Sequence, residues 1–265
     1  MKKHLVIFIF FFNLPFADIA YGQFTYGTTG LLHMPTADMH RDKTVMAGAS
    51  YLDVAATPGE WDYNTWNYYL NLTIFPWLEV GYVCTLLKMA VPELQLSNKF
   101  RNQDRNFAVR LRLWKEGWWK PWTPQVVLGT NDPGTSSHSN GFGSASATGN
   151  GYWNRYYLAM SKHFSWKQVA DIGLHAAYLY NRRELYHYNG PAVGANLRFN
   201  QPESSFGNRL LNGLNLMVEY DSCTVNVGGS YSVWKDRINV VAELNQCKHL
   251  SAGSCVPILT TENYE

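Results

Sequence analysis

The amino-acid sequence predicts an all-β protein: an antiparallel transmembrane β-barrel of about 12 strands, with about 10 as the alternative count. Three observations predict this fold. The N-terminus has the form of a secretory signal, apolar and polar residues alternate in one run after another, and the aromatic content is 15%. The formal net charge of +2 over 265 residues leaves no basic surface for a nucleic acid.

The start of the chain predicts export. Lys2 and Lys3 precede an apolar run, residues 5–12, and small residues follow that run. We therefore divide the chain into a signal peptide, residues 1–22, and an outer-membrane β-barrel domain, residues 23–265. No later stretch is long and apolar enough to cross a bilayer as a helix, so an exported chain of this kind is either a soluble protein or a β-barrel.

The alternation is clearest in residues 68–82, YYLNLTIFPWLEVGY. Large apolar side chains fall on one parity and mostly smaller, polar ones on the other, until the pattern breaks at Pro76 and resumes through Leu78 and Val80. We interpret this stretch as a lipid-facing strand, a turn at Phe75-Pro76 and the next strand. Similar alternation recurs in residues 107–113, 193–199, 214–220 and 225–231.

The polar parity of these runs decides between two architectures. A membrane barrel turns its apolar face to lipid and its polar face to the lumen, whereas a soluble sandwich buries the apolar face between two sheets. The polar face carries charges of both signs that are able to pair across a lumen, which favours the barrel. The lumen candidates are Arg110, Arg112, Asp171, His175, Asn196, Arg198, Asn215 and Glu219. A sandwich with these residues facing water stays open as the alternative.

Aromatic residues lie mainly near the ends of the runs, where a membrane barrel carries its interfacial girdles. The girdle candidates are Trp66, Tyr68, Trp77, Trp118, Trp119, Trp122, Trp153, Tyr156 and Tyr157. An aromatic core and a platform for stacking sugars are the alternatives.

No residue pattern indicates a catalytic or metal site. The cysteines, Cys84, Cys223, Cys247 and Cys255, match no zinc-ligand spacing, although the last two are near enough in sequence to close a small loop. We therefore expect no metal and no cofactor.

One short motif raises the question of hydrolysis. Residues 136–141, SSHSNG, are similar to the His-x-Ser-Asn-Gly element of outer-membrane phospholipases. Here His138 and Ser139 are adjacent, and neighbours on a strand point to opposite faces. A polar loop is the better interpretation, and we predict no catalytic residue.

Three stretches together resemble the YjbH-like family of outer-membrane proteins associated with exopolysaccharide. The first is TYGTTGLLHMPTADM, residues 25–39, and the second is TIFPWLEVGY, residues 73–82. The third runs from VRLRLWKE, residues 109–116, through VVLGTNDPGT, residues 126–135, to YYLAMSK, residues 156–162. Their shared order over this length carries the resemblance.

The resemblance implies a β-barrel in the outer membrane of a Gram-negative bacterium that contributes to exopolysaccharide production or export as a pore or scaffold. Its expected partners are outer-membrane lipid, polysaccharide and periplasmic export components, and it brings no catalytic residues. Two alternatives stay open: an outer-membrane lipid or polysaccharide hydrolase, and a soluble secreted sugar-binding β-sandwich.

Overall fold

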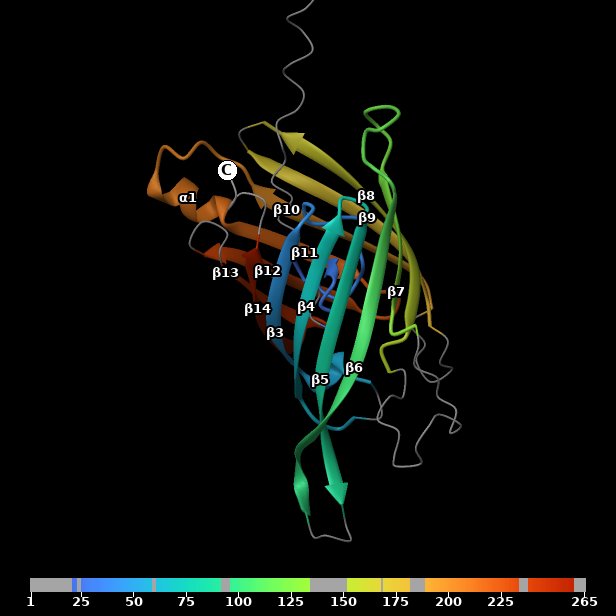
Figure 1. The fold of residues 1–265 in the computed structure, drawn as a ribbon. Helices are drawn as coiled ribbons and strands as arrows, with labels where there is room; N and C mark the ends of the chain where they lie inside the picture. The colour runs from blue at the N-terminus through green and yellow to red at the C-terminus, as the bar shows by residue number, and fades with distance from the viewer. Residues whose placement is uncertain are drawn as a thin grey trace, which may run out of the picture.

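A computed structural model describes residues 21–22, 25–58, 61–91, 96–133, 152–167, 169–181, 189–233 and 238–259. Within these residues, strands β3 to β14 form one closed antiparallel barrel, so the prediction of a barrel of about 12 strands is confirmed (Figure 1). The strands are β1 (Tyr21–Gly22), β2 (Thr29–Gly30), β3 (Thr44–Leu52), β4 (Thr65–Phe75), β5 (Leu78–Val91), β6 (Leu96–Trp114), β7 (Gln125–Asn131), β8 (Arg155–Trp166), β9 (Ala170–Tyr180), β10 (Gly190–Phe199), β11 (Leu214–Tyr220), β12 (Val225–Val233), β13 (Ile238–Asn245) and β14 (His249–Leu259).

Every barrel strand pairs with its neighbours in the chain, except where the ring closes. Closure is made by β14 and β3, with Cys255 opposite Gly48 in the register. The last strand therefore covers the edge of the first, and the barrel has no open edge. Figure 1 also shows the β5–β6 hairpin extending beyond the ring of strands.

The side chains of the barrel strands alternate between the inside and the outside, as the alternation in the sequence predicts. On β4, Asn67 and Tyr69 are buried inside the barrel, while Trp66, Tyr68 and Leu70 are exposed outside. The predicted turn at Pro76 lies between β4 and β5, where a proline is tolerated because it has no amide hydrogen to offer the ladder.

The outside of the barrel is apolar. At mid-strand, Leu128 on β7 is 46% exposed and Leu174 on β9 is 49% exposed, and large apolar side chains repeat outward around the ring. Monomeric soluble proteins rarely expose apolar surface on this scale, whereas membrane barrels carry such a band. This polarity is the reverse of that of a soluble β-sandwich.

The girdle prediction is correct in part. Among its members, Trp66, Trp77 and the three tryptophans of the β6–β7 connection point outward, at Trp118, Trp119 and Trp122. For Trp153 and Tyr157 the prediction is wrong, since both are buried within the barrel. Trp153 packs edge-on against the ring of Trp61, which draws it inward.

The remaining elements are short. A 3-10 turn (Val54–Ala56) lies in the β3–β4 connection, and helix α1 (Phe206–Asn212), capped by Ser205, lies between β10 and β11. No helix in the described part of the chain is long and apolar enough to cross a membrane.

Other sequence predictions meet the structure only in part. The predicted signal peptide lies outside the described residues except for Tyr21–Gly22, and the SSHSNG motif lies wholly outside them. The four cysteines are free: Cys247 is exposed in the β13–β14 turn and Cys255 is buried, so the loop-closing disulfide is not formed.

A feature absent from the sequence analysis fills the lumen. Residues 25–42, called the plug below, run inside the ring before the chain enters β3. Leu32, Met34 and Ala37 have no exposed surface. A bridge between Gly30 and Pro35 folds the segment back on itself.

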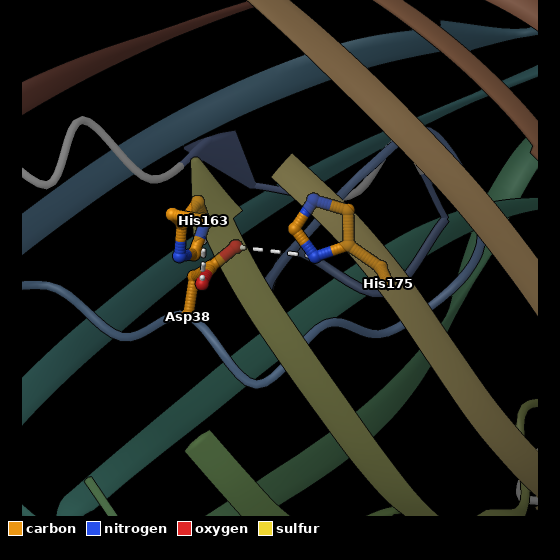
Figure 2. Close-up of side chains that lie close together, drawn as sticks. All are labelled: Asp38, His163 and His175. Atoms are coloured by element: carbon orange, nitrogen blue, oxygen red, sulfur yellow. Dashed lines mark ion pairs between the residues drawn. The ribbon is translucent and has the colours of Figure 1, made fainter. Parts of the chain in front are cut away.

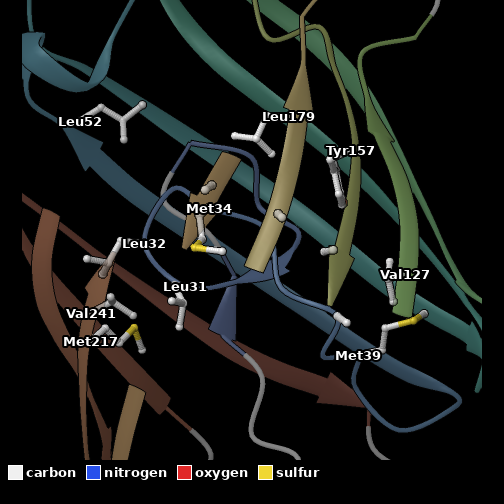
Figure 3. Packing of buried hydrophobic residues seen from close by; sticks show 14 residues of the cluster. Leu31, Leu32, Met34, Met39, Leu52, Val127, Tyr157, Leu179, Met217 and Val241 are labelled. Atoms are coloured by element: carbon white, nitrogen blue, oxygen red, sulfur yellow. The ribbon is translucent and has the colours of Figure 1, made fainter. Parts of the chain in front are cut away.

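The plug packs through apolar side chains against the wall. Figure 3 shows Leu31 and Leu32 on the side of Met217 and Val241, within a cluster that also holds Met34 and Met39. Small wall residues make room for them: a Cβ added at Gly194 would lie 2.5 Å from Cδ1 of Leu31. Gly30, Pro35 and Thr36 are buried in this segment, inside the barrel.

Candidate functional site: the plugged lumen

Polar side chains of the wall hold the plug from several sides, beginning with Glu79 on β5. Its Oε1 accepts hydrogen bonds from the backbone N–H of Thr29 at 2.9 Å and from the amide of Asn71 at 2.8 Å. Its Oε2 accepts from the Thr29 hydroxyl at 2.8 Å and from Arg110 at 2.7 Å. A buried carboxylate is stable only when its oxygens are satisfied in this way.

Glu219 on β11 binds the next turn of the plug. Its carboxylate accepts from three consecutive backbone N–H groups, with shortest distances of 3.0 Å for Leu32, 2.7 Å for His33 and 3.2 Å for Met34. Asn226 on β12 donates to the same carboxylate at 3.2 Å. Glu219 thus supplies these N–H groups with the acceptor that a neighbouring strand supplies in a sheet.

Two arginines of the wall donate hydrogen bonds to plug carbonyl groups. Arg110 on β6 donates through Nη2 to the carbonyls of Thr36 at 2.5 Å and Asp38 at 2.9 Å. Arg155 on β8 donates through Nη1 to the carbonyl of His33 at 2.9 Å. The wall thus supplies acceptors to the plug's N–H groups and donors to its carbonyls.

The side chain of His33 completes the attachment. Its Nε2 lies 2.8 Å from the Glu243 carboxylate on β13, and its Nδ1 lies 2.9 Å from the Thr25 hydroxyl. Burial opposes protonation of this imidazole, but Glu243, with further help from Glu219 and Asp221, raises the pKa of His33 to about 9. His33 is therefore a cation at neutral pH.

The lumen candidates of the sequence analysis all lie on interior-facing positions of the strands, but only some of them touch the plug. Arg110 and Glu219 bind it directly, and Arg112 reaches the carbonyl of Met39 at 3.5 Å. His175, Asn196 and Asn215 form a row of hydrogen bonds across β9, β10 and β11.

Asp171 and Arg198 lie farther along the same strands and are half-buried. They occupy opposite register positions on β9 and β10. The carboxylate of Asp171 accepts hydrogen bonds from Ser165 and Asn200. The distance between Asp171 and His175 along β9 leaves the two without a shared hydrogen bond, as the strand geometry predicts.

The sequence analysis missed other residues that hold the plug. Glu79 and Glu243 stand on the polar parity of their runs, so the alternation that identified the other candidates would also have selected them. His33, Asp38 and Arg155 lie outside any alternating run that we identified, and no local pattern marks them.

A recess lies next to the plug at the end of the barrel that carries the β3–β4 and β7–β8 connections. Its lining includes Tyr26, Tyr152, Arg155, Asp221 and Asn245. The guanidinium of Arg155 lies 3.4 Å from the centre of the Tyr26 ring, which fixes both side chains. The guanidinium covers one face of Tyr26, so the aromatic surface of the recess comes from Tyr152, next to the carboxylate of Asp221 and the amide of Asn245.

The fold and the site define a closed β-barrel whose lumen is occupied by its own N-terminal segment. Comparison with known proteins assigns the family. Residues 22–226 match the family YjbH, described as exopolysaccharide biosynthesis protein YbjH. The chain therefore belongs to the YjbH exopolysaccharide biosynthesis family.

A relative and a solved structure complete the comparison. The "uncharacterized lipoprotein YjbH" of Escherichia coli (strain K12) is 30% identical over 149 residues, which cover 55% of this chain and 17% of that protein. The chain thus spans less than a fifth of that relative. The crystal structure of Pseudomonas aeruginosa OccK11 (OpdR) covers 80% of this chain and 63% of its own, with 10% identity and a TM-score of 0.24. A TM-score this low does not establish a shared fold.

Proposed function

We propose that this chain is an outer-membrane barrel that contributes to exopolysaccharide production as a closed scaffold rather than as an open pore. The apolar exterior supports the membrane location, and membership of the YjbH family supports the pathway. One observation carries the choice of scaffold over pore: buried charged side chains from opposite sides of the wall bind the plug backbone, at Glu79, Arg110 and Glu219.

The strength of this attachment argues against spontaneous opening. Withdrawing the plug would expose the carboxylates and guanidinium groups that it satisfies, and each hydrogen bond to a charged group contributes about 1.5–3 kcal/mol. The apolar contacts of Leu31, Leu32 and Met34 would be lost in the same step. A polysaccharide would therefore contact the recess and the rim of this barrel and would not pass through its lumen.

The recess gives the scaffold a place to contact sugar: its cavity volume of about 40 Å³ admits a hydroxyl group rather than a whole ring. Tyr152 supplies aromatic surface, and Asp221 and Asn245 supply hydrogen-bonding groups for hydroxyls. Sugars are bound by this combination of stacking and directional hydrogen bonds. We therefore assign saccharide contact to this end of the barrel.

A plug locked by a disulfide distinguishes scaffold from pore. The close approach of Gly194 to Leu31 suits the pair Leu31→Cys and Gly194→Cys, in a background in which the exposed Cys223 and Cys247 are replaced by serine. Deletion of the protein from the producing bacterium should lower surface polysaccharide. We expect the locked barrel to restore it as fully as the unlocked serine background does.

Two controls complete this test. Each single cysteine variant, which cannot form the bridge, should restore polysaccharide equally, and mobility before and after boiling should show a folded barrel in the outer-membrane fraction. Loss of polysaccharide in the locked variant that is reversed by a reductant would instead establish a gated pore. Recovery of the protein in the soluble periplasm would remove the membrane assignment.

A further inference from the structure

Three metal-ligand side chains meet at the end of the lumen where the plug leads into β3. Asp38 comes from the plug, His163 from β8 and His175 from β9, and their ligand atoms all lie within 4.8 Å of one another. Figure 2 shows the Asp38 carboxylate between the two imidazole rings. Oδ1 of Asp38 lies 3.4 Å from Nε2 of His163, and Oδ2 lies 3.7 Å from Nδ1 of His175.

Hydrogen bonds to Glu116 set the orientation of His163. Its Nδ1 lies 2.7 Å from the Glu116 carboxylate, which can only accept, so this nitrogen carries a proton. Glu116 also accepts from the His163 backbone N–H at 3.1 Å, which fixes it in place. In the neutral ring the lone pair then resides on Nε2, the nitrogen that faces Asp38.

The orientation of His175 is set in the same manner. The amide of Asn196 donates to Asn215 at 2.8 Å, so its oxygen is the atom that faces Nε2 of His175 at 2.9 Å. Nε2 therefore carries a proton, and in the neutral ring the lone pair resides on Nδ1. That nitrogen faces Asp38 and accepts a hydrogen bond from the Ser161 hydroxyl at 2.8 Å.

We propose that Asp38, His163 and His175 form a binding site for a divalent transition-metal cation such as Zn²⁺. Histidine ligands characteristically donate their second ring N–H to a carboxylate or carbonyl group, and both rings here do so before any ion is present. Two imidazoles with one carboxylate select Zn²⁺, Co²⁺ or Ni²⁺ over Mg²⁺ and Ca²⁺, which prefer oxygen ligands alone.

The site needs a small closure to bind an ion. Ligand bonds of about 2.0–2.2 Å place ligand atoms about 3–4 Å apart, so the two Asp38 contacts already fit and the two imidazole nitrogens must approach each other. The His163 side chain is 32% exposed and has room to shift while Glu116 holds its Nδ1, whereas the His175 side chain is 1% exposed. Ser161 would release Nδ1 of His175 in the same step.

Metal binding would tie the plug to the wall, because one ligand belongs to the plug and two belong to strands. Exposure of Asp38 and His163 gives an ion a path from this end of the barrel without unfolding. No spacing rule predicts this site from the sequence, since Asp38 precedes His163 by more than a hundred residues.

Cobalt titration tests the site directly. Folded barrel in detergent, free of any affinity tag that contains histidine, is titrated with Co²⁺ and followed by visible absorption, and Zn²⁺ is then added in competition. We expect a d–d band at one equivalent that Zn²⁺ displaces. Asp38→Asn or His175→Gln should abolish the band, and Glu116→Gln, which removes only the partner of His163, should weaken affinity by about 10–100-fold.

A matched control lies at the opposite end of the barrel. His249 pairs with Asp53 at 3.2 Å, and within the described part of the chain no third ligand side chain joins them, so His249→Gln should leave the titration unchanged. Bound Zn²⁺ should also slow hydrogen exchange of the plug amides from residues 37 to 39. The proposal is overturned if the folded wild type gives no band at millimolar Co²⁺, or if the ligand variants bind as the wild type does. Boiling-dependent mobility verifies that each variant is folded.

Discussion

The guanidinium of Arg110 and the carboxylate of Glu79 lie 2.7 Å apart, and neither side chain has any exposed surface. The pair joins adjacent strands β5 and β6 and, through Thr29 and Thr36, grips two separate parts of the plug. Each member therefore satisfies groups that the other cannot reach, and the pair acts as a single attachment point between wall and plug.

Removing both members of this pair should cost less than the sum of the two single removals. Glu79→Gln leaves the Arg110 charge buried without its counter-ion, which costs about 3–5 kcal/mol. Adding Arg110→Met removes that charge, so the double variant should lose less than the sum of the two single losses. The measurement is the free energy of unfolding in detergent by urea titration, arranged as a double-mutant cycle.

The half-exposed pair of His249 and Asp53 provides the comparison. His249→Gln should change stability by less than about 1 kcal/mol, because solvent screens an exposed pair. A Glu79→Gln loss as small as this one would mean that Glu79 does not hold the plug.

The fit between plug and wall gives a second prediction. A methyl group at Gly194 would meet Cδ1 of Leu31 at 2.5 Å and Sδ of Met34 at 2.9 Å, so Gly194→Ala should destabilise the barrel by about 1–3 kcal/mol. Combining it with Leu31→Ala should recover part of that loss relative to the two single variants. Thermal unfolding followed by gel mobility measures both effects.

A glycine with free space serves as the reference. Gly207 lies in helix α1, where an added methyl group meets only Oγ of Ser205, at 3.8 Å. Gly207→Ala should be neutral or slightly stabilising, because alanine favours helix more than glycine does. If Gly194→Ala behaves like Gly207→Ala, the plug does not press on β10 as described.

The wall could be predicted from the sequence because its rule is local. Each strand alternates with a period of two, so residues 214–220 reveal their two faces without knowledge of the rest of the chain. The predicted lumen residues Arg110 and Glu219 follow from this rule. The closing strand β14 was less evident, because its outward positions include Ala252 and Ser254, and the alternation fades there.

The plug could not be predicted because its partners are distant in sequence. Glu219 lies 187 residues from Leu32, and Glu79 lies 50 residues from Thr29. The segment has no alternation, and its glycine, proline and threonine residues have the composition of a turn. Only the closed barrel brings these carboxylates to the same backbone.

The charge on His33 makes the plug sensitive to alkaline pH. Glu243 raises the pKa of His33 to about 9 against its ordinary value of 6.5, despite burial, with Glu219 and Asp221 also facing it. A pKa raised by folding stabilises fully below the unfolded value, and that stabilisation is lost as the pH rises through the folded value. We expect the contribution of His33 to be complete near pH 6 and absent above about pH 10.

Comparison with His33→Gln isolates this contribution from other groups that titrate at high pH. The measured quantity is the difference in unfolding free energy between wild type and variant at a series of pH values. It should shrink by a few kcal/mol between pH 6.5 and 10, since each unit of pKa shift corresponds to about 1.4 kcal/mol. A difference that is constant over this pH range would contradict a pKa of His33 raised by folding.

The apolar exterior yields the prediction that bears most directly on the membrane. Leu158 on β8 stands outward between Leu128 and Tyr178 of the neighbouring strands, and Trp166 stands outward at the end of β8, with exposed fractions of 44% and 65%. In a bilayer, Leu158→Arg should cost about 2–4 kcal/mol because the charge lies in the middle of the apolar band, and Trp166→Arg about 0–1 kcal/mol because it lies near the interface. Equilibrium folding into phospholipid vesicles measures both. A barrel whose exterior faced water would tolerate the two arginines equally, so the depth dependence, not the size of either loss, decides where this surface resides.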